Sequence, residues 1–518
     1  MSGTAPTTGD RGTVSREARG GLPPWRRGEL PAPPSTEGLR LLSVVGPGAI
    51  ALGAALGSGE WLIGPATFVK YGLTLLWVTL LGAFFQTILN TEVVRYTLYT
   101  GEPAFTGFMR TWPGPRFWAW TYAIIFFFQA GWPGWAGASA GAFFYLGSGR
   151  LPGGGDARAI YLLGVAAFAV CVAILVFSGK RIERTLEILN WILVTTIFAA
   201  IFILCLVYAP AERWVAAGAG LFGFDPASRR FLFLPEGADW FLIGAFAAYS
   251  GAGGLINVTI SNWTRDKGYG MGSVVGYIPA AVGGRKVNLP HVGTVFETTP
   301  EALTRWRGWW RIVRADQWGL FFCGAMLGMV LPGILYTAAL PAATDVRGLA
   351  MAASLSRALA ERGGTLVAVV VALISVWILF KAQLDILEGM VRAVTDILWS
   401  GSEKARAWRG GDVRFVYYGV LAVVVVWGLI ALSLTPPYIL LQLGANVAGV
   451  AMVVSSLHIL RVNTTLLPEP LRPPIWRRVG LVAMALFYFF FVWLWLMGGL
   501  VPDTANGFLF NIGRTLSS

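Results

Sequence analysis

Long apolar runs, joined by short polar connections, dominate the pattern of this chain. The runs approach or exceed 18 residues and carry almost no charge, and about 20 residues are enough for a helix to cross a hydrocarbon core. The apolar residues do not alternate with enough polar positions to build soluble domains. We predict eleven membrane helices, at residues 42–70, 73–99, 117–147, 158–178, 187–209, 239–263, 317–339, 366–398, 415–433, 437–459 and 477–500. The pattern therefore predicts an all-α, polytopic membrane protein.

The two ends of the chain follow a different pattern. Residues 1–38 are rich in Gly, Pro, Ser, Thr and Arg and have no hydrophobic period, which is typical of a disordered tail. No apolar signal-peptide region follows the start, so we expect the first helix to insert uncleaved. With an odd number of helices, the tail 501–518 is expected on the side opposite to the N-terminus.

Composition and charge support this view. Only 13% of the 518 residues are charged, against roughly 25% in an average soluble protein, and 55% are apolar. A soluble enzyme and an intrinsically disordered chain are excluded. Most of the 40 Lys and Arg residues fall in the tail and in the connections on the same side of the membrane. By the positive-inside rule, this predicts a cytoplasmic N-terminus in the plasma (inner) membrane and explains the net charge of +13 without nucleic acid.

The first segment holds a dense glycine cluster in its middle, directly followed by a carboxylate. Gly57, Ser58 and Gly59 precede Glu60. A charge at this depth costs at least about 2.5 kcal/mol and normally marks a functional position. We therefore predict that these four residues contribute to a substrate site.

The sixth segment has a similar interruption, at Tyr249, Ser250 and Gly251, with Asn257 one turn further on. The two segments correspond if residues 39–210 (helices 1–5) and 211–460 (helices 6–10) are two repeats, followed by helix 11 and the tail at 461–518. Paired interrupted helices in corresponding positions indicate the binding site of an inverted-repeat transporter. Two closely packed helices without a ligand are the alternative.

Other charges also lie inside predicted spans. Residues 381, 385, 388, 392 and 396 follow helical spacing and place five charges on one stripe of the eighth segment. Either a proton relay or a structural ladder of ion pairs would account for the stripe. Glu92 and Arg95 are three residues apart and can pair with each other. The candidates for coupling or gating are Glu92, Arg95, Gln129, Lys381, Asp385, Glu388 and Arg392.

Several chemistries find no support in the sequence. There is no Walker A loop, dinucleotide fingerprint, HExxH or nucleophile elbow, so we expect neither an enzyme nor a cofactor. His291 and His458 have no ligand at metal-binding spacing, and the three cysteines look like packing residues. The stretch 304–314 mixes Trp with Arg and is either the start of the seventh span or an interfacial helix.

The first two segments resemble the Nramp divalent-metal transporters. The resemblance rests on GPG (46–48), GSGE (57–60), YGLTLLW (71–77), Gln86 and Arg95, and on the linker at 179–183. It covers residues 40–265 best and the remainder only by helix count. It implies a LeuT-type fold with two inverted five-helix repeats, an eleventh helix, and alternating access around discontinuous helices 1 and 6.

The departures from that family concern the metal ligands. The family's DPGN falls on residues 57–60, so Gly57 replaces the ligating Asp and Glu60 replaces the Asn. Its MPH motif falls near residues 248–250, where neither Met nor His is present. Loss of the sulfur ligand disfavours typical Mn²⁺ or Fe²⁺ sites. The oxygen ligands that remain, Glu60, Ser58 and Asn257, suit a hard or hydrated cation such as Mg²⁺.

These expectations lead to one principal hypothesis and two alternatives. The principal one is a secondary transporter of a divalent cation in the lipid bilayer, with protons as the candidate coupling ion. The segment GSGEWLIGPATFVKYG also resembles the first helix of amino-acid permeases, so transport of a small organic amine or amino acid is the second hypothesis. The third is a membrane receptor or scaffold that does not transport.

Overall fold

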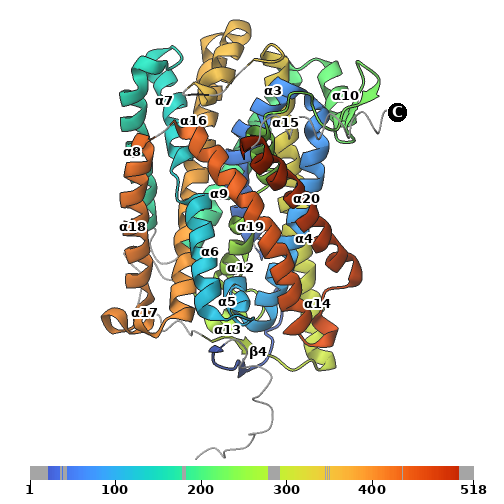
Figure 1. Ribbon diagram of the computed structural model, residues 1–518, viewed down its shortest axis with the longest axis vertical. Coiled ribbons are helices and arrows are strands. Elements are labelled where there is room, and N and C mark those ends of the chain that lie inside the picture. Colours follow the sequence, from blue (N-terminus) through green and yellow to red (C-terminus); the bar gives the residue numbers. More distant parts are fainter. Residues whose placement is uncertain are drawn as a thin grey trace, which may run out of the picture.

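The computed structural model describes residues 21–35, 38, 44–177, 182–277, 292–344, 346, 348, 350–434 and 436–500. Within these ranges, eight helices are long and apolar enough to cross a membrane. They run roughly along the long axis of a single helical bundle (Figure 1). The fold class predicted from the sequence, an all-α polytopic membrane protein, is confirmed.

The helices of the bundle have the following bounds. They are α2 (Pro47–Ala55), η2 (Leu56–Ile63), α3 (Gly64–Tyr71), α4 (Leu76–Thr100), α6 (Pro115–Ala130), α7 (Gly134–Ser148), α8 (Ala157–Phe177), α9 (Ile182–Tyr208), α11 (Trp240–Ala248), α12 (Leu255–Lys267), α14 (Pro300–Arg314), η5 (Ala315–Phe322), α15 (Cys323–Ala339), α16 (Ser354–Gly401), α18 (Val413–Leu434), α19 (Pro437–Thr465) and α20 (Ile475–Leu500). Most of the long helices overlap the predicted segments, and α14 precedes the predicted seventh one.

Short elements lie at the two ends of the bundle. These are the helices α5 (Ala104–Met109), α10 (Ala211–Gly220), α13 (Gly272–Val275) and α17 (Glu403–Ala407), and the single turns η3 (Leu73–Leu75), η4 (Gly154–Asp156), η6 (Met351–Ala353), η7 (Trp408–Gly410) and η8 (Glu469–Leu471). At one end, β1 (Arg26–Arg27) pairs in parallel with β4 (Thr294–Val295). At the other end, β2 (Phe224–Asp225) pairs antiparallel with β3 (Arg230–Phe231).

The outer helices present apolar side chains outwards. Exposed large apolar residues include Leu162 and Val170 on α8, Phe202 on α9, Val423 on α18 and Phe489 on α20. A soluble monomer rarely exposes so much apolar surface. These faces are therefore suited to contact with lipid.

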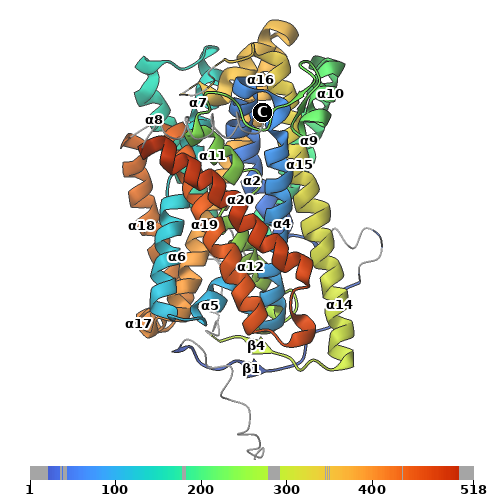
Figure 2. The ribbon, with the colours of Figure 1, turned by 45° about the vertical axis from the view of Figure 1, so that its right-hand side comes forward.

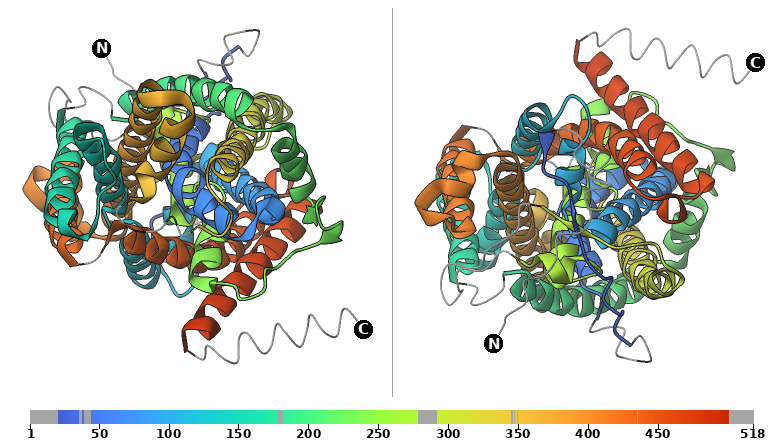
Figure 3. Two further views of the ribbon diagram at one scale, coloured as in Figure 1. Left: turned by 90° about the horizontal axis from the view of Figure 1, so that it is seen from above. Right: turned by 90° about the horizontal axis from the view of Figure 1, so that it is seen from below.

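The two segments that the sequence singled out lie in the centre. Every residue of α2 is buried, and α12 is buried from Leu255 to Asp266. Seen along the bundle axis, the blue α2 and the green α12 lie inside a ring of other helices (Figure 3). On one side α20 crosses the bundle obliquely and contacts α4, α11 and α19 (Figure 2). α2 is apolar on all sides, as expected of a helix in a buried position.

The interruption of the first segment differs from our expectation. We predicted an unwound chain at Gly57–Glu60, but η2 continues the helix through eight residues of π-helix. The Gly64 amide donates to the Gly59 carbonyl, five residues earlier. Wide turns of this kind keep the backbone hydrogen bonds inside the segment, which the surroundings of a membrane helix require.

The sixth segment is broken as predicted. α11 ends at Ala248, and α12 begins at Leu255 after six residues that are not helical. Gly251, Gly253 and Gly254 have φ values of 123°, 78° and 57°, which a residue with a Cβ rarely adopts. The third segment is also divided, because α6 ends at Ala130 and α7 begins only after Pro133.

Residues 21–35, which we call the N-terminal strap, are ordered, although we predicted disorder over residues 1–38. Trp25 and Leu30 are 7% and 1% exposed. Arg26 and Gly28 donate backbone hydrogen bonds to Gly293 and Val295 at β4. The strap crosses the end face of the bundle (Figure 3, right). Its composition suggests disorder, but its few apolar residues are buried in this tertiary contact.

The remaining expectations about local structure have mixed outcomes. Residues 304–314 lie in α14, which runs on through η5 into α15, so they form the start of the seventh span. Cys171 and Cys205 are buried as packing residues, whereas Cys323 is exposed. His291 and the linker residues 179–181 lie outside the described residues.

Candidate functional site

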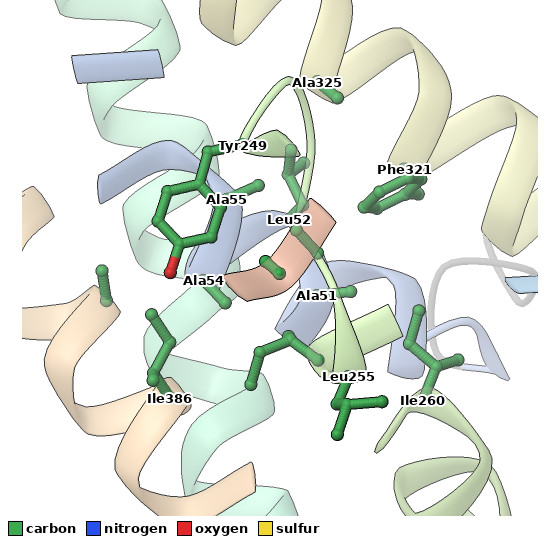
Figure 4. Packing of buried hydrophobic residues seen from close by; sticks show 14 of the residues in the cluster. Ala51, Leu52, Ala54, Ala55, Tyr249, Leu255, Ile260, Phe321, Ala325 and Ile386 are labelled. Carbon is green, nitrogen blue, oxygen red and sulfur yellow. The ribbon is translucent and has the colours of Figure 1, made fainter. Parts of the chain in front are cut away.

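The π-helix of segment 1 and the break of segment 6 meet at the centre of the bundle. A Cβ atom added to Gly59 would lie 1.6 Å from the carbonyl oxygen of Tyr249. No side chain could therefore replace the hydrogen at Gly59 without moving the chain. Figure 4 shows Tyr249 and Leu255, on either side of the break, in the same buried cluster as Ala54 and Ala55 of α2.

Two glutamines hold the backbone of the break between α11 and α12. Gln86 on α4 donates to the carbonyls of Ala248 and Ser250 (3.3 and 3.0 Å) and accepts from the Gly253 amide (3.0 Å). Gln129 on α6 donates to the Gly253 carbonyl (3.1 Å) and accepts from the Leu255 amide (2.8 Å). These amides replace the hydrogen bonds that the helix loses at the break. Gln129, predicted to act in coupling or gating, thus contacts the break itself.

Ser250 and Asn257 face α4 in this structure. The Ser250 hydroxyl donates to the Phe246 carbonyl (2.9 Å), and the Asn257 side-chain amide donates to Gln86 (3.0 Å). The Asn257 Oδ1 atom is buried and has no hydrogen-bond partner. Asn257 thus keeps an unused acceptor in the centre.

Glu60 is fully buried, and neither of its carboxylate oxygens has a hydrogen-bond partner. Its side chain packs on α15, because a Cβ at Gly328 would lie 3.1 Å from the Glu60 Cγ atom. A buried carboxylate without a partner is costly, so it needs a proton or a cation. The Ser58 side chain lies outside the described residues, and the metal set Glu60, Ser58 and Asn257 stays a prediction.

Aromatic side chains border the break. The rings of Trp135 and Tyr249 lie 6.2 Å apart, and both residues are almost fully buried. The indole N–H of Trp135 is buried without an acceptor. Nearby on α16, Gln383 accepts a hydrogen bond from the Ala136 amide (3.1 Å). This part of the centre thus offers ring faces and an unused donor.

All five charges of the stripe on α16 are buried and paired. Lys381 binds Asp385, and Arg392 binds Glu388 and Asp266. Arg265 on α12 binds Asp266 (2.7 Å) and Asp396 (2.5 Å). Asn262 and Trp263 of α12 also donate to Asp396 and Glu388. The part of the stripe from Glu388 to Asp396 therefore belongs to an ion-pair network that joins α12 to α16.

Glu92 and Arg95 pair with each other, as their spacing predicts (2.8 Å). Glu92 also accepts from Arg477 on α20 (3.0 Å) and Asn463 on α19 (2.9 Å). The Trp310 ring lies against the guanidinium groups of both arginines. With all these partners, Glu92 joins α4, α19 and α20.

The structure also shows functional candidates that the sequence reasoning missed. Asn190 on α9 binds Asp385 (3.2 Å), and Asp316 in η5 accepts the Gly46 and Gly48 amides (2.9 and 2.8 Å) at the start of α2. A polar residue inside an apolar run was the available signal for Asn190.

His458 is bound at both ring nitrogens, by Thr111 and Tyr122. Among the described residues, no group of three or more His, Cys, Asp or Glu residues could hold a metal ion.

Comparison with known proteins identifies the fold but not a family. No family model and no curated protein sequence matches the chain. A crystal structure of the manganese transporter of Eremococcus coleocola, in complex with an aromatic bis-isothiourea substituted compound, matches with a TM-score of 0.59 and 15% identity. The match covers 93% of this chain and 94% of that one. A histidine-to-alanine mutant of the same transporter also has a TM-score of 0.59, at 14% identity over 95% of each chain.

The structure of Mhp1, a nucleobase-cation-symport-1 family transporter with bromovinylhydantoin bound, matches with a TM-score of 0.50 and 16% identity. It covers 89% of this chain and 90% of that one. At these identities the likeness establishes the fold alone, and the predicted LeuT-type fold is confirmed.

Proposed function

We propose that this protein is a secondary active transporter whose substrate binds where the interruptions of segments 1 and 6 meet. The observation that carries the proposal is the contact between Gly59 and the Tyr249 carbonyl in the buried centre. Irregular helices around the substrate are typical of such transporters, and here segment 6 is broken while segment 1 is widened into a π-helix. The neighbours in fold, a manganese transporter and a nucleobase-cation symporter, agree with this function.

A divalent cation is the substrate that Glu60 favours. Both oxygens of its carboxylate are without a partner in the closed centre, and a cation would satisfy them. Oxygen ligands without sulfur suit a hard or hydrated cation such as Mg²⁺ rather than typical Mn²⁺ or Fe²⁺. Asn257, with its unused Oδ1 atom, is the proposed second ligand.

A small organic amine or amino acid is the second candidate, and the aromatic wall favours it. Trp135 and Tyr249 offer ring faces, and the unused indole N–H of Trp135 can donate to a polar atom of such a solute. Pockets for organic ligands typically combine aromatic walls with a few placed polar groups.

The proposed orientation follows from charge. The end of the bundle with β1 and β4 carries the arginines of α14 and of the strap, so we place it on the cytoplasmic side. The chain would then cross the plasma membrane several times with its N-terminus inside. The division into repeats at 39–210 and 211–460, followed by 461–518, is part of the same proposal.

Uptake into proteoliposomes tests the substrate. Uptake of Mg²⁺ and of Mn²⁺ would be measured for the wild type, for Glu60→Gln and for Glu361→Gln. We expect Glu60→Gln to reduce Mg²⁺ uptake about tenfold or more, equivalent to about 1.4 kcal/mol. Glu361 is an exposed carboxylate on α16, with 72% of its side chain accessible, so its variant should transport like the wild type.

Each other outcome identifies a different hypothesis. Equal Mg²⁺ uptake by the wild type and Glu60→Gln would remove Glu60 as the cation ligand. Calorimetry against a panel of amines and amino acids, with Trp135→Phe as the comparison variant, tests the second candidate. A wild type that neither takes up cations nor binds any member of the panel would favour the non-transporting receptor or scaffold.

A further inference from the structure

Three polar side chains, all fully buried, meet beside Gly53 of α2. Lys381 and Asp385 come from α16, and Asn190 comes from α9. Lys381 donates to the Oδ1 atom of Asp385, and the Asn190 amide donates to the same atom at 3.2 Å. The cluster lies where segment 1 contacts two other helices, because α2 packs on both α9 and α16.

Two oxygens of this cluster have no hydrogen-bond partner, namely Asp385 Oδ2 and Asn190 Oδ1. A Cβ atom at Gly53 would lie 2.7 Å from the first and 1.5 Å from the second, so the two oxygens are at most 4.2 Å apart. Two buried acceptors this close to each other, neither with a donor, lose the free energy of hydration and repel each other. Something positive must therefore join them.

A proton fits this position better than a metal ion. A divalent metal ion needs about six oxygen ligands, whereas this cluster offers two unused ones. The Lys381 ammonium, already bound to the same carboxylate, would also repel a second cation. A proton on Asp385 needs only one acceptor, and Asn190 Oδ1, which lies beside the same glycine, is the unused acceptor of the cluster. An Asp385 O–H donating to Asn190 satisfies both oxygens at once.

We propose that Asp385 is the group that binds and releases the coupling proton of this transporter. The carboxylate takes up one proton on Oδ2 when α2 covers the cluster, and the resulting O–H forms a hydrogen bond to Asn190 Oδ1. The proton leaves to water when α2 moves away. No other bond forms or breaks. This inference rests on the proposed transport function and assigns its coupling ion.

Several charged and titratable groups lie near Asp385, and those on α16, α9 and α8 already have partners. On α16, Lys381 binds Oδ1 and Glu388 is bound to Arg392. On α9, Glu187 is bound to Lys267, and on α8 the Cys171 thiol donates to the Phe380 carbonyl. α2, with the sequence PGAIALGAA, carries no titratable side chain. Movement of α2 is therefore what would expose Oδ2 to water.

Infrared spectroscopy of the purified full-length chain tests the proton without any transport. A protonated carboxylic acid has a C=O band that shifts in D₂O. We expect Asp385→Asn to remove one component of this band and Asn190→Ala to shift that component. Asn446→Ala should leave it unchanged, because Asn446 is a buried asparagine bound to the Phe241 carbonyl, away from the cluster. Glu60→Gln serves to identify any component that belongs to Glu60.

Transport measurements then test coupling. Uptake driven by a pH gradient should fall about tenfold or more in Asp385→Asn, while exchange of internal for external substrate persists, since exchange requires no release of the proton. An unchanged infrared band in Asp385→Asn would overturn the proposal, and so would a sodium-induced spectral change that Asp385→Asn abolishes. If the wild type shows no transport at all, the transport function fails, and the infrared result still decides whether Asp385 holds a proton.

Discussion

Gly59 shows how one missing side chain determines the packing of the centre. Its α-hydrogen faces the Tyr249 carbonyl, where a Cβ atom would lie only 1.6 Å from the oxygen. The backbone of η2 has ordinary helical dihedral angles at both ends, so the glycine is needed for close approach rather than for an unusual conformation.

Gly59→Ala should therefore destabilise the protein by about 1–3 kcal/mol, as overpacking in a core does. The midpoint of thermal unfolding in detergent measures the effect. Gly319→Ala is the matched control, since a Cβ at Gly319, in the π-helical turn η5, meets nothing within 4 Å. Equal midpoints for both variants would show that segments 1 and 6 do not touch at Gly59.

At this scale the sequence predicts pairs between neighbouring residues better than pairs between distant ones. The pairing of Glu92 with Arg95 follows from a spacing of three residues, and it is found. The contact of Glu92 with Arg477 joins residues 385 positions apart, and no local pattern encodes such a pair. The burial of Glu60 was expected, but its position against Gly328 of α15 depends on how two helices pack.

At the scale of elements, the break in segment 6 depends on side chains of other helices. The chain between α11 and α12 has lost helical hydrogen bonds, and Gln86 and Gln129 replace them from α4 and α6. Glycine clusters and charges near the break were visible in the sequence. That two glutamines on separate segments would hold it was not, since an amide inside an apolar span has many potential partners.

Gln129→Leu should expose this dependence. The variant leaves the Gly253 carbonyl and the Leu255 amide without partners, at a cost of about 1–3 kcal/mol for each buried group. Hydrogen exchange at the Leu255 amide should become faster. Gln442→Leu is the control, because Gln442 is also buried and none of its side-chain atoms is hydrogen-bonded to the described residues. Unchanged exchange at Leu255 would contradict the role assigned to Gln129.

The ion-pair network between α12 and α16 makes a second prediction about elements. Asp266 accepts from both Arg265 and Arg392, and all three are almost fully buried. Asp266→Asn leaves two buried arginines short of a counter-charge, and removal of one partner from a buried pair typically costs about 3–5 kcal/mol.

We expect a lower unfolding midpoint and faster hydrogen exchange in the last turn of α12. The control is Asp156→Asn, whose carboxylate pairs with the exposed Arg150 at the other end of the bundle. Surface pairs contribute about 0–1 kcal/mol. Equal unfolding midpoints for Asp266→Asn and Asp156→Asn would show that the network between α12 and α16 does not stabilise the fold.

The two segments differ in how their backbone hydrogen bonds are satisfied, and this explains why the unwound chain predicted for segment 1 was wrong. Glycines next to a carboxylate are compatible with an unwound chain and also with a π-helical turn. The choice between them depends on whether neighbouring helices can satisfy free carbonyls, as Gln86 and Gln129 do in segment 6. In segment 1 the Gly59 carbonyl is instead satisfied by Gly64 within the helix.

At the scale of the whole molecule, the N-terminal strap joins the start of the chain to elements that follow much later. The Glu102 carboxylate, which follows α4, connects these parts of the chain. It accepts hydrogen bonds from Arg110, Tyr96 and the Gly293 amide. Arg110 in turn donates to the Pro23 carbonyl of the strap. Trp25 packs on Tyr99 and on the Arg110 guanidinium. Glu102 thus binds the segment before β4 directly and the strap through Arg110.

The attachment of the strap should depend on pH. Burial raises the pKa of Glu102, but the charge and hydrogen bonds of Arg110 outweigh it and hold the pKa below its ordinary value of 4.5. A carboxylate with a lowered pKa stabilises the fold fully above its ordinary pKa, and this stabilisation is lost as the pH falls through the lowered value. Protection of the Arg26 and Gly28 amides, corrected for intrinsic exchange, should therefore decline only below about pH 4.5.

Glu102→Gln provides the comparison. Without the charge, the variant should show weaker protection of the two amides at neutral pH and little further change on acidification. Protection that is the same in both proteins across this range would mean that the strap is held without the charge of Glu102.

The pairing of β1 with β4 also has a consequence for how the protein is made. Arg26 and Thr294 are neighbours in the parallel ladder, so the partner of β1 leaves the ribosome only after the first six membrane segments have been synthesised. Until then Trp25 and Leu30 have no surface on which to pack. During that time the N-terminus stays accessible to chaperones and proteases, and its attachment marks a chain whose first six segments have already been synthesised.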